Sequence, residues 1–70
     1  MTPRDLSTWA KNNGARRTLI ARKGGAYEVR AFIPLRLRGA FRDAAKGAGL
    51  RLRWNGQTNM STLSVTIRVS

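Results

Sequence analysis

The sequence predicts a small α+β domain whose elements follow the order α-β-β-α-β-β. Residues 50–54 and 63–69 alternate strictly between apolar and polar side chains, which is the pattern of half-buried strands. A Gly-Gly pair separates two further strand-like runs, and the two remaining segments carry apolar residues at helical spacing. We therefore expect short antiparallel hairpins that are covered on one face by helices.

The first element is a helix within residues 1–14, and both of its ends carry the usual signals. Thr2 can accept a hydrogen bond as the N-cap, and Asp5 lies where a carboxylate favours the positive end of the helix dipole. The pair Asn13-Gly14 is typical of residues that end a helix. A narrow apolar stripe at helical spacing consists of Leu6, Trp9 and Ala10. We expect the tryptophan to pack onto the body of the fold rather than to stack on a base.

The second element is a hairpin over residues 16–33, with Gly24 and Gly25 as its two-residue turn. With this turn, Ile20 pairs with Val29 across the two strands. The face that we expect in the core carries Ile20, Tyr27, Val29, Ala31 and Ile33. The opposite face carries Arg17, Leu19, Lys23, Glu28, Arg30 and Phe32. The first face is apolar, whereas the second is basic with one aromatic residue.

The third element is a helix over residues 35–48, because Pro34 fits a helix start and Gly47 a helix end. Its apolar positions are Leu37, Phe41, Ala44, Ala45 and Ala48. A basic stripe beside them, with one residue in every four, consists of Arg38, Arg42 and Lys46. A competing interpretation extends the preceding strand through residues 35–38, which alternate. The proline at position 34 disfavours that extension in a central strand.

The last element is a second hairpin over residues 50–69, in which we expect residues 55–59 to form a turn-rich connector. The inward positions are Leu50, Leu52, Trp54, Leu63, Val65, Ile67 and Val69. The outward positions are Arg51, Arg53, Ser64, Thr66 and Arg68. The four elements follow one another without a linker, so we expect a single domain over residues 1–70.

The composition excludes most enzymatic functions. Eleven arginines and three lysines face only three acids, and without histidine the formal net charge is +11. The absence of Cys and His removes the usual soft-metal ligands, the thiol nucleophile and the commonest general base. Three scattered carboxylates are too few for an acid/base pair or a magnesium site. We therefore expect no enzymatic activity, no catalytic residue, no metal and no cofactor.

The basic residues gather on the faces that the pattern places outside the core, which favours binding to a nucleic acid. Only Glu28 and Asp43 dilute the positive charge there, so an ordinary solvated surface explains the pattern less well. Ser64 and Thr66 lie between the strand arginines, where hydroxyls suit phosphate oxygens. The residues that we expect to bind nucleic acid are Arg17, Arg22, Lys23, Arg30, Arg38, Arg42, Arg51, Arg53 and Arg68.

Residues 30–41 read Arg-Ala-Phe-Ile-Pro-Leu-Arg-Leu-Arg-Gly-Ala-Phe. This segment resembles the Arg-x-x-Ile-Pro-x-x-Leu-Arg-x-x-Leu segment of AbrB-type regulators, which form the swapped-hairpin group together with MazE-type antitoxins. The family's order of hairpin, helix and hairpin also looks like residues 17–69. The resemblance implies a homodimer with interleaved hairpins, in which Arg30 and Arg38 fall on DNA-binding positions. The helix that precedes the first hairpin is extra relative to the family.

Taken together, these features predict a small cytoplasmic DNA-binding protein, a transcription regulator that acts as a homodimer. DNA is favoured over RNA, and no run approaches the roughly 20 apolar residues that span a bilayer, so we expect no membrane association. A chain this short buries only about 60% of its unfolded surface, which favours a dimer. Two alternatives stay open. One is a protein that binds single-stranded DNA or RNA, with Phe32 as a stacking surface. The other is a basic inhibitor or assembly factor that binds an acidic protein surface.

Overall fold

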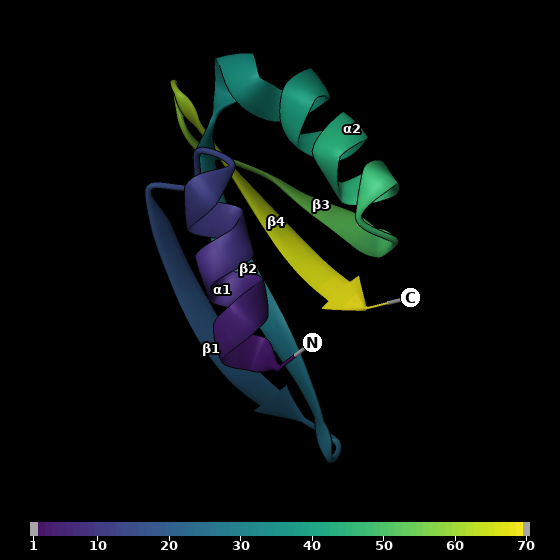
Figure 1. Cartoon of the computed structure of the whole chain (residues 1–70). Coiled ribbons are helices and arrows are strands. Elements are labelled where there is room, and N and C mark those ends of the chain that lie inside the picture. The colour runs from purple at the N-terminus through teal and green to yellow at the C-terminus, as the bar shows by residue number, and fades with distance from the viewer. Residues whose placement is uncertain (1, 70) are drawn as a thin grey trace.

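The computed structural model describes residues 2–69, which form helices and strands in the predicted order α-β-β-α-β-β (Figure 1). The elements are α1 (Pro3–Asn12), β1 (Arg17–Lys23), β2 (Ala26–Pro34), the 3-10 turn η1 (Leu35–Leu37), α2 (Arg38–Gly47), β3 (Leu50–Asn59) and β4 (Thr62–Val69). The side chains of Lys23 and Val69, predicted to face outward and inward, lie outside the described part of the chain. The predicted α+β class is confirmed.

The strands form one antiparallel sheet in the order β1-β2-β4-β3. Both helices lie on the same face of this sheet, with α1 against β1 and β2 and α2 against β3 (Figure 1). The two hairpins are therefore joined within one chain by the pairing of β2 with β4. Each half of the chain contributes one helix and one hairpin.

Helix α1 begins with a reciprocal pair of hydrogen bonds, of which the sequence predicts the one that Thr2 accepts as the N-cap. The Asp5 backbone N–H donates to the Thr2 hydroxyl at 3.1 Å, and the Thr2 backbone N–H donates to the Asp5 carboxylate at 3.1 Å. These two bonds form a capping box. The hydrogen bonds from the Thr2 backbone and side chain lower the pKa of the Asp5 carboxyl below its usual value. The helix ends at Asn12 with Asn13 as its C-cap, at the predicted Asn13-Gly14 stop.

The first hairpin has the predicted turn and register. Gly24 and Gly25 both adopt positive φ, at 58° and 83°, and Ile20 pairs with Val29. The prediction that Ile20 and Tyr27 lie in the core is wrong, because their side chains are 50% and 53% exposed. Both lie on the helix side of the sheet, but the hairpin extends beyond α1, so no helix covers its far end (Figure 1).

The segment between β2 and α2 forms neither the start of one continuous α-helix over residues 35–48 nor an extension of the strand through residues 35–38. Strand β2 ends at Pro34, and residues 35–37 form a 3-10 turn before α2 begins at Arg38. Pro34 keeps an extended backbone with φ −59° and ψ 137° and is the N-cap of the 3-10 turn, so helical geometry begins at Leu35. Of the predicted apolar helix positions, Phe41 and Ala45 are buried, whereas Ala48 follows the last helical residue and is exposed.

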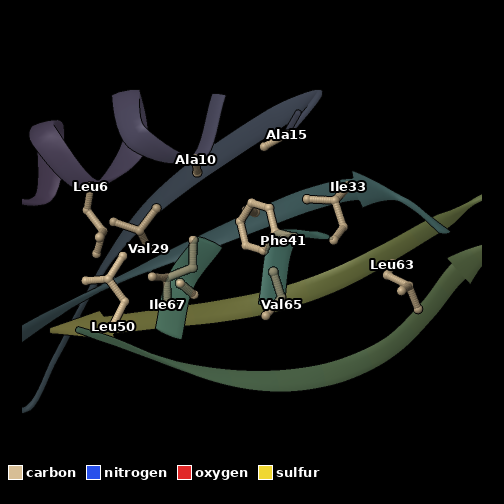
Figure 2. Close-up of a cluster of buried hydrophobic side chains, with 12 residues drawn as sticks. Leu6, Ala10, Ala15, Val29, Ile33, Phe41, Leu50, Leu63, Val65 and Ile67 are labelled. Atoms are coloured by element: carbon tan, nitrogen blue, oxygen red, sulfur yellow. The ribbon is translucent and has the colours of Figure 1, made fainter. Parts of the chain in front are cut away.

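The predicted connector at residues 55–59 is wrong, because these residues continue strand β3 to Asn59. The strand contains two irregularities, between Trp54 and Gly56 and between Gln57 and Asn59, and Gly56 has a φ of +106°. Such bulges bend a strand without ending its pairing. Figure 2 shows the resulting curvature of β3 beside β4. The turn residues of this segment therefore produce a bend, and hydrogen bonding to β4 keeps it in the sheet.

The hydrophobic core lies between the two helices and the sheet (Figure 2). Phe41 of α2 and the central strand residues beneath it are almost completely buried. The buried apolar residues of the central strands are Val29, Ala31, Ile33, Leu63, Val65 and Ile67. The Trp9 ring meets the Phe41 ring edge to face, with centroids 5.2 Å apart at 65°. This contact joins the two helices and confirms that Trp9 packs onto the body of the fold.

The two glycines Gly14 and Gly39 should respond oppositely to alanine. Gly14 has a φ of +106°, and a Cβ there would lie 2.5 Å from Leu37 Cδ1, so G14A should lower the free energy of unfolding by about 1–2 kcal/mol. Gly39 lies in α2 with open space at its Cβ, so G39A should raise it by about 0.5 kcal/mol. Urea denaturation measures both, and equal changes would contradict the assigned backbone conformations.

The capping box should make stability depend on pH. The folded state lowers the pKa of Asp5, so its stabilising contribution is present above the unfolded pKa of about 3.9 and is lost as pH falls below it. D5N should therefore be less stable than the wild type at pH 6, and the difference in Tm should shrink between pH 5 and pH 2. A difference in Tm that stays constant over this range would contradict the role of the ionised carboxylate.

Candidate nucleic-acid interface

The two helices leave the second face of the sheet without a covering element among the described residues. The alternation of side chains and the strand registers define this surface, which we call the open face. Its described side chains are those of Arg17, Leu19, Ala21, Ala26, Glu28, Arg30, Phe32, Arg51, Arg53, Asn55, Thr62, Ser64, Thr66 and Arg68. Every strand of the sheet therefore contributes to one continuous surface.

Five of the predicted binding residues meet on the open face, and all five are exposed to solvent. They are Arg17, Arg30, Arg51, Arg53 and Arg68. They come from every strand, so residues as far apart in sequence as positions 17 and 68 share one surface. The pairing of β2 with β4, which no local pattern determines, brings the arginines of the two hairpins together.

Three other predicted residues lie on the helix side of the sheet. Arg22 pairs with Tyr27, and its guanidinium lies 5.8 Å from the centre of that ring. Arg38 at the start of α2 places its guanidinium 5.4 Å from the Trp54 ring. The Nε atom of Arg42 lies 3.6 Å from the Asp43 carboxylate. The predicted binding residues therefore lie on two faces of the molecule. The positive charge of the open face comes from the arginines of the strands.

The hydroxyls predicted to meet phosphate are on the open face but are almost inaccessible. Ser64 and Thr66 are only 5% and 6% exposed. Asn55 donates from Nδ2 to Thr66 Oγ1 at 2.9 Å and to Ser64 Oγ at 3.4 Å. The two hydroxyls thus tie the bent part of β3 to β4. Asn55 was expected in a connector. The outward alternation of positions 51 and 53, continued to position 55, could have predicted that its side chain lies on the open face.

Phe32 lies on the open face, which is the basic face of the hairpin on which the sequence pattern placed it. Its ring is half-buried between the strand partners Arg17 and Ser64. The Arg17 guanidinium lies 5.9 Å from the ring centre, in the range of a cation–π contact. Among the described side chains, Phe32 is the only aromatic on this face.

One carboxylate faces the arginines of the open face within the described residues. Arg68 Nη2 donates to Glu28 Oε1 at 2.5 Å, and the Glu28 side chain is 19% exposed. On its other side, Arg68 lies directly opposite Arg51 in the β3–β4 register. Like charges directly opposite one another in a sheet are destabilising. The five arginines of the open face therefore outnumber its one described carboxylate, and the surface carries a net positive charge.

Other kinds of site are not found in residues 2–69. No group of three or more His, Cys, Asp or Glu side chains in this range could hold a metal ion. No helix in this range is long and apolar enough to cross a membrane. No family model matches the sequence, and no curated protein or solved structure matches it either. The resemblance to the AbrB-type regulators and MazE-type antitoxins stays an expectation from the sequence, so a function must be inferred from the surface itself.

The Asn55 side chain should be needed for stability. N55A removes the donor to two nearly buried hydroxyls, which should lower the free energy of unfolding by about 1–3 kcal/mol. Q57A is a matched control, because Gln57 is exposed and donates only to the Asn59 carbonyl at 3.3 Å, and its effect should stay within about 0.5 kcal/mol. Urea denaturation that ranks the two variants equally would contradict the structural role of Asn55.

Proposed function

We propose that this protein binds DNA and that the open face is its contact surface. The observation that carries the proposal is the group of exposed arginines that every strand contributes to this one uncovered face. The guanidinium fork is suited to phosphate oxygens, and neutralisation of phosphates by cationic side chains releases bound counterions. Association with a polyanion would also relieve the mutual repulsion of these charges.

The shape of the charged surface favours an extended ligand. Arg17 lies on the edge strand β1 and Arg53 on the opposite edge strand β3, with Arg30 on a central strand between them. Strands lie about 4.8 Å apart, so the arginines spread across the whole width of the sheet. A DNA backbone can contact such a surface along its length. Strands are also known to enter a groove of the duplex, where arginine can donate to guanine.

The open face favours duplex DNA over a single strand. Proteins that hold single strands without sequence preference stack successive bases on several aromatic side chains. Among the described residues, Phe32 is the only aromatic on this face, and its ring is half-buried beside Arg17. The arginines are therefore the main contact groups that the surface offers, and these suit the regular phosphates of a duplex.

A role as a transcription regulator that acts as a homodimer belongs to the same proposal and is supported by the sequence resemblance alone. Strands β2 and β4 already pair within one chain, so two chains need not exchange hairpins to complete the sheet. Light scattering of the free protein and of its DNA complex would establish how many copies bind. A monomer in both states would contradict the homodimer.

Duplex DNA should bind with a steep dependence on salt. R17A and R30A should each reduce the slope of log affinity against log salt concentration by about 1. R42A removes the same charge from the helix side and should leave the slope nearly unchanged, so it is the matched control. Fluorescence anisotropy with a labelled duplex measures all three variants. An equal or larger effect of R42A, or the absence of binding, would overturn the proposal.

A second candidate is binding to single-stranded DNA or RNA, and the contact of Arg17 with Phe32 is the observation that favours it. The phenylalanine ring with its guanidinium could receive one base by stacking. Competition between a duplex and either of its separate strands decides between the candidates. Tighter binding to the single strand, together with a loss of at least about fivefold in F32L, would support this second candidate and contradict the preference for a duplex.

A further inference from the structure

We propose that the open face contains a site for one phosphate group, in the shallow cavity between β3 and β4. The cavity has a volume of about 180 Å³ and is lined by Arg51, Leu52, Arg53, Thr66 and Arg68. A water molecule occupies about 30 Å³ in the liquid, so the cavity has room for a group of several heavy atoms. This inference rests on the proposed function, because it identifies where one phosphate of a DNA backbone would be held.

Three arginines line this cavity because of the strand register. Arg51 lies directly opposite Arg68, and Arg53 lies directly opposite Thr66 in the next pair on the same face. Side chains directly opposite one another have Cβ atoms about 5 Å apart, and neighbours on the same face of a strand are about 7 Å apart. The three arginines therefore rise from three corners of a small area whose fourth corner is Thr66.

The charges around the cavity are not balanced by the described part of the protein. Glu28 pairs with Arg68, but no carboxylate within residues 2–69 forms an ion pair with Arg51 or Arg53. The facing pair of arginines is unfavourable in the absence of an anion. An anion between them would convert this repulsion into two charge-assisted attractions. The cavity is therefore arranged to bind negative charge.

The chemistry of the cavity favours phosphate over a carboxylate. A phosphate group presents oxygens in several directions and can accept hydrogen bonds from three guanidinium groups, whereas a carboxylate has two oxygens in one plane. The three arginines that line the cavity therefore suit a phosphate group better than a carboxylate.

Glu28 limits the affinity of this site by competing for Arg68. Its carboxylate accepts a hydrogen bond from Nη2 of Arg68, which lines the cavity, and its negative charge opposes a bound anion. E28Q should therefore raise the affinity for phosphate by about three- to tenfold, while R51A and R53A should each lower it by about tenfold. R17A removes the same charge from the same face outside the cavity, so it should change the affinity less than about twofold.

The experiment is a titration of the full chain with inorganic phosphate and, separately, with dimethyl phosphate, followed through the arginine Nε–H signals by NMR. Sodium chloride at matched ionic strength is the control. The signals of Arg51, Arg53 and Arg68 should shift together and saturate with both phosphates, and those of Arg17 and Arg42 should not. R51K, which keeps the charge but loses the fork, should bind more weakly than the wild type. Uniform, non-saturating shifts that chloride reproduces would overturn the site.

Binding of a labelled duplex to the same variants separates this inference from the proposed function. DNA binding that depends on Arg30 but is unchanged in R51A and R53A would overturn the phosphate site and leave the proposed function intact. Saturable binding of inorganic phosphate without any binding of DNA would support the cavity as an anion site and overturn the DNA function. Loss of duplex affinity in R51A and R53A, with a gain in E28Q, would support both.

Discussion

The pairing of β2 with β4 is the contact on which the rest of the structure depends. It joins the two α-β-β halves, and the residues on its helix side, such as Val29 and Ile67, are fully buried. Because side chains alternate along a strand, the same register places Arg30 and Thr66 on the opposite face. A slip by one residue would bury the arginine and expose the apolar residues. The core and the open face are thus two consequences of one register.

The polar centre of the open face has a structural role, and its charged surroundings remain available to a ligand. Ser64 and Thr66 are held by Asn55 in the interior of the face, where water hardly reaches them. The arginines around them keep their head groups in solvent, which limits the cost of their mutual repulsion. Glu28 offsets part of that repulsion at Arg68. The surface is stable without a ligand, but its charge is most easily balanced by an anion.

Local signals predicted much of the fold, and the failures share one cause. The capping box of Thr2 and the Gly24-Gly25 turn depend on residues close in sequence, so their patterns were sufficient. The Asn-Gly pair at Asn55 indicates a turn locally, yet hydrogen bonding to β4 turns it into a bulge. Periodicity placed Ile20 on the correct face of its strand, but only the length of α1 relative to the hairpin decides whether that face is covered.

The sequence by itself determined the order of the elements, the positive charge and the separation of apolar from basic positions along each strand. These properties depend on composition and on the period of each element, which can be read from neighbouring residues. Only the tertiary structure decided that Arg17, Arg30 and Arg53 share one face while Arg38 and Arg42 lie on the other side. The physical reason is that the strand order β1-β2-β4-β3, with β2 paired to β4, comes from packing between distant segments. No local pattern encodes that choice.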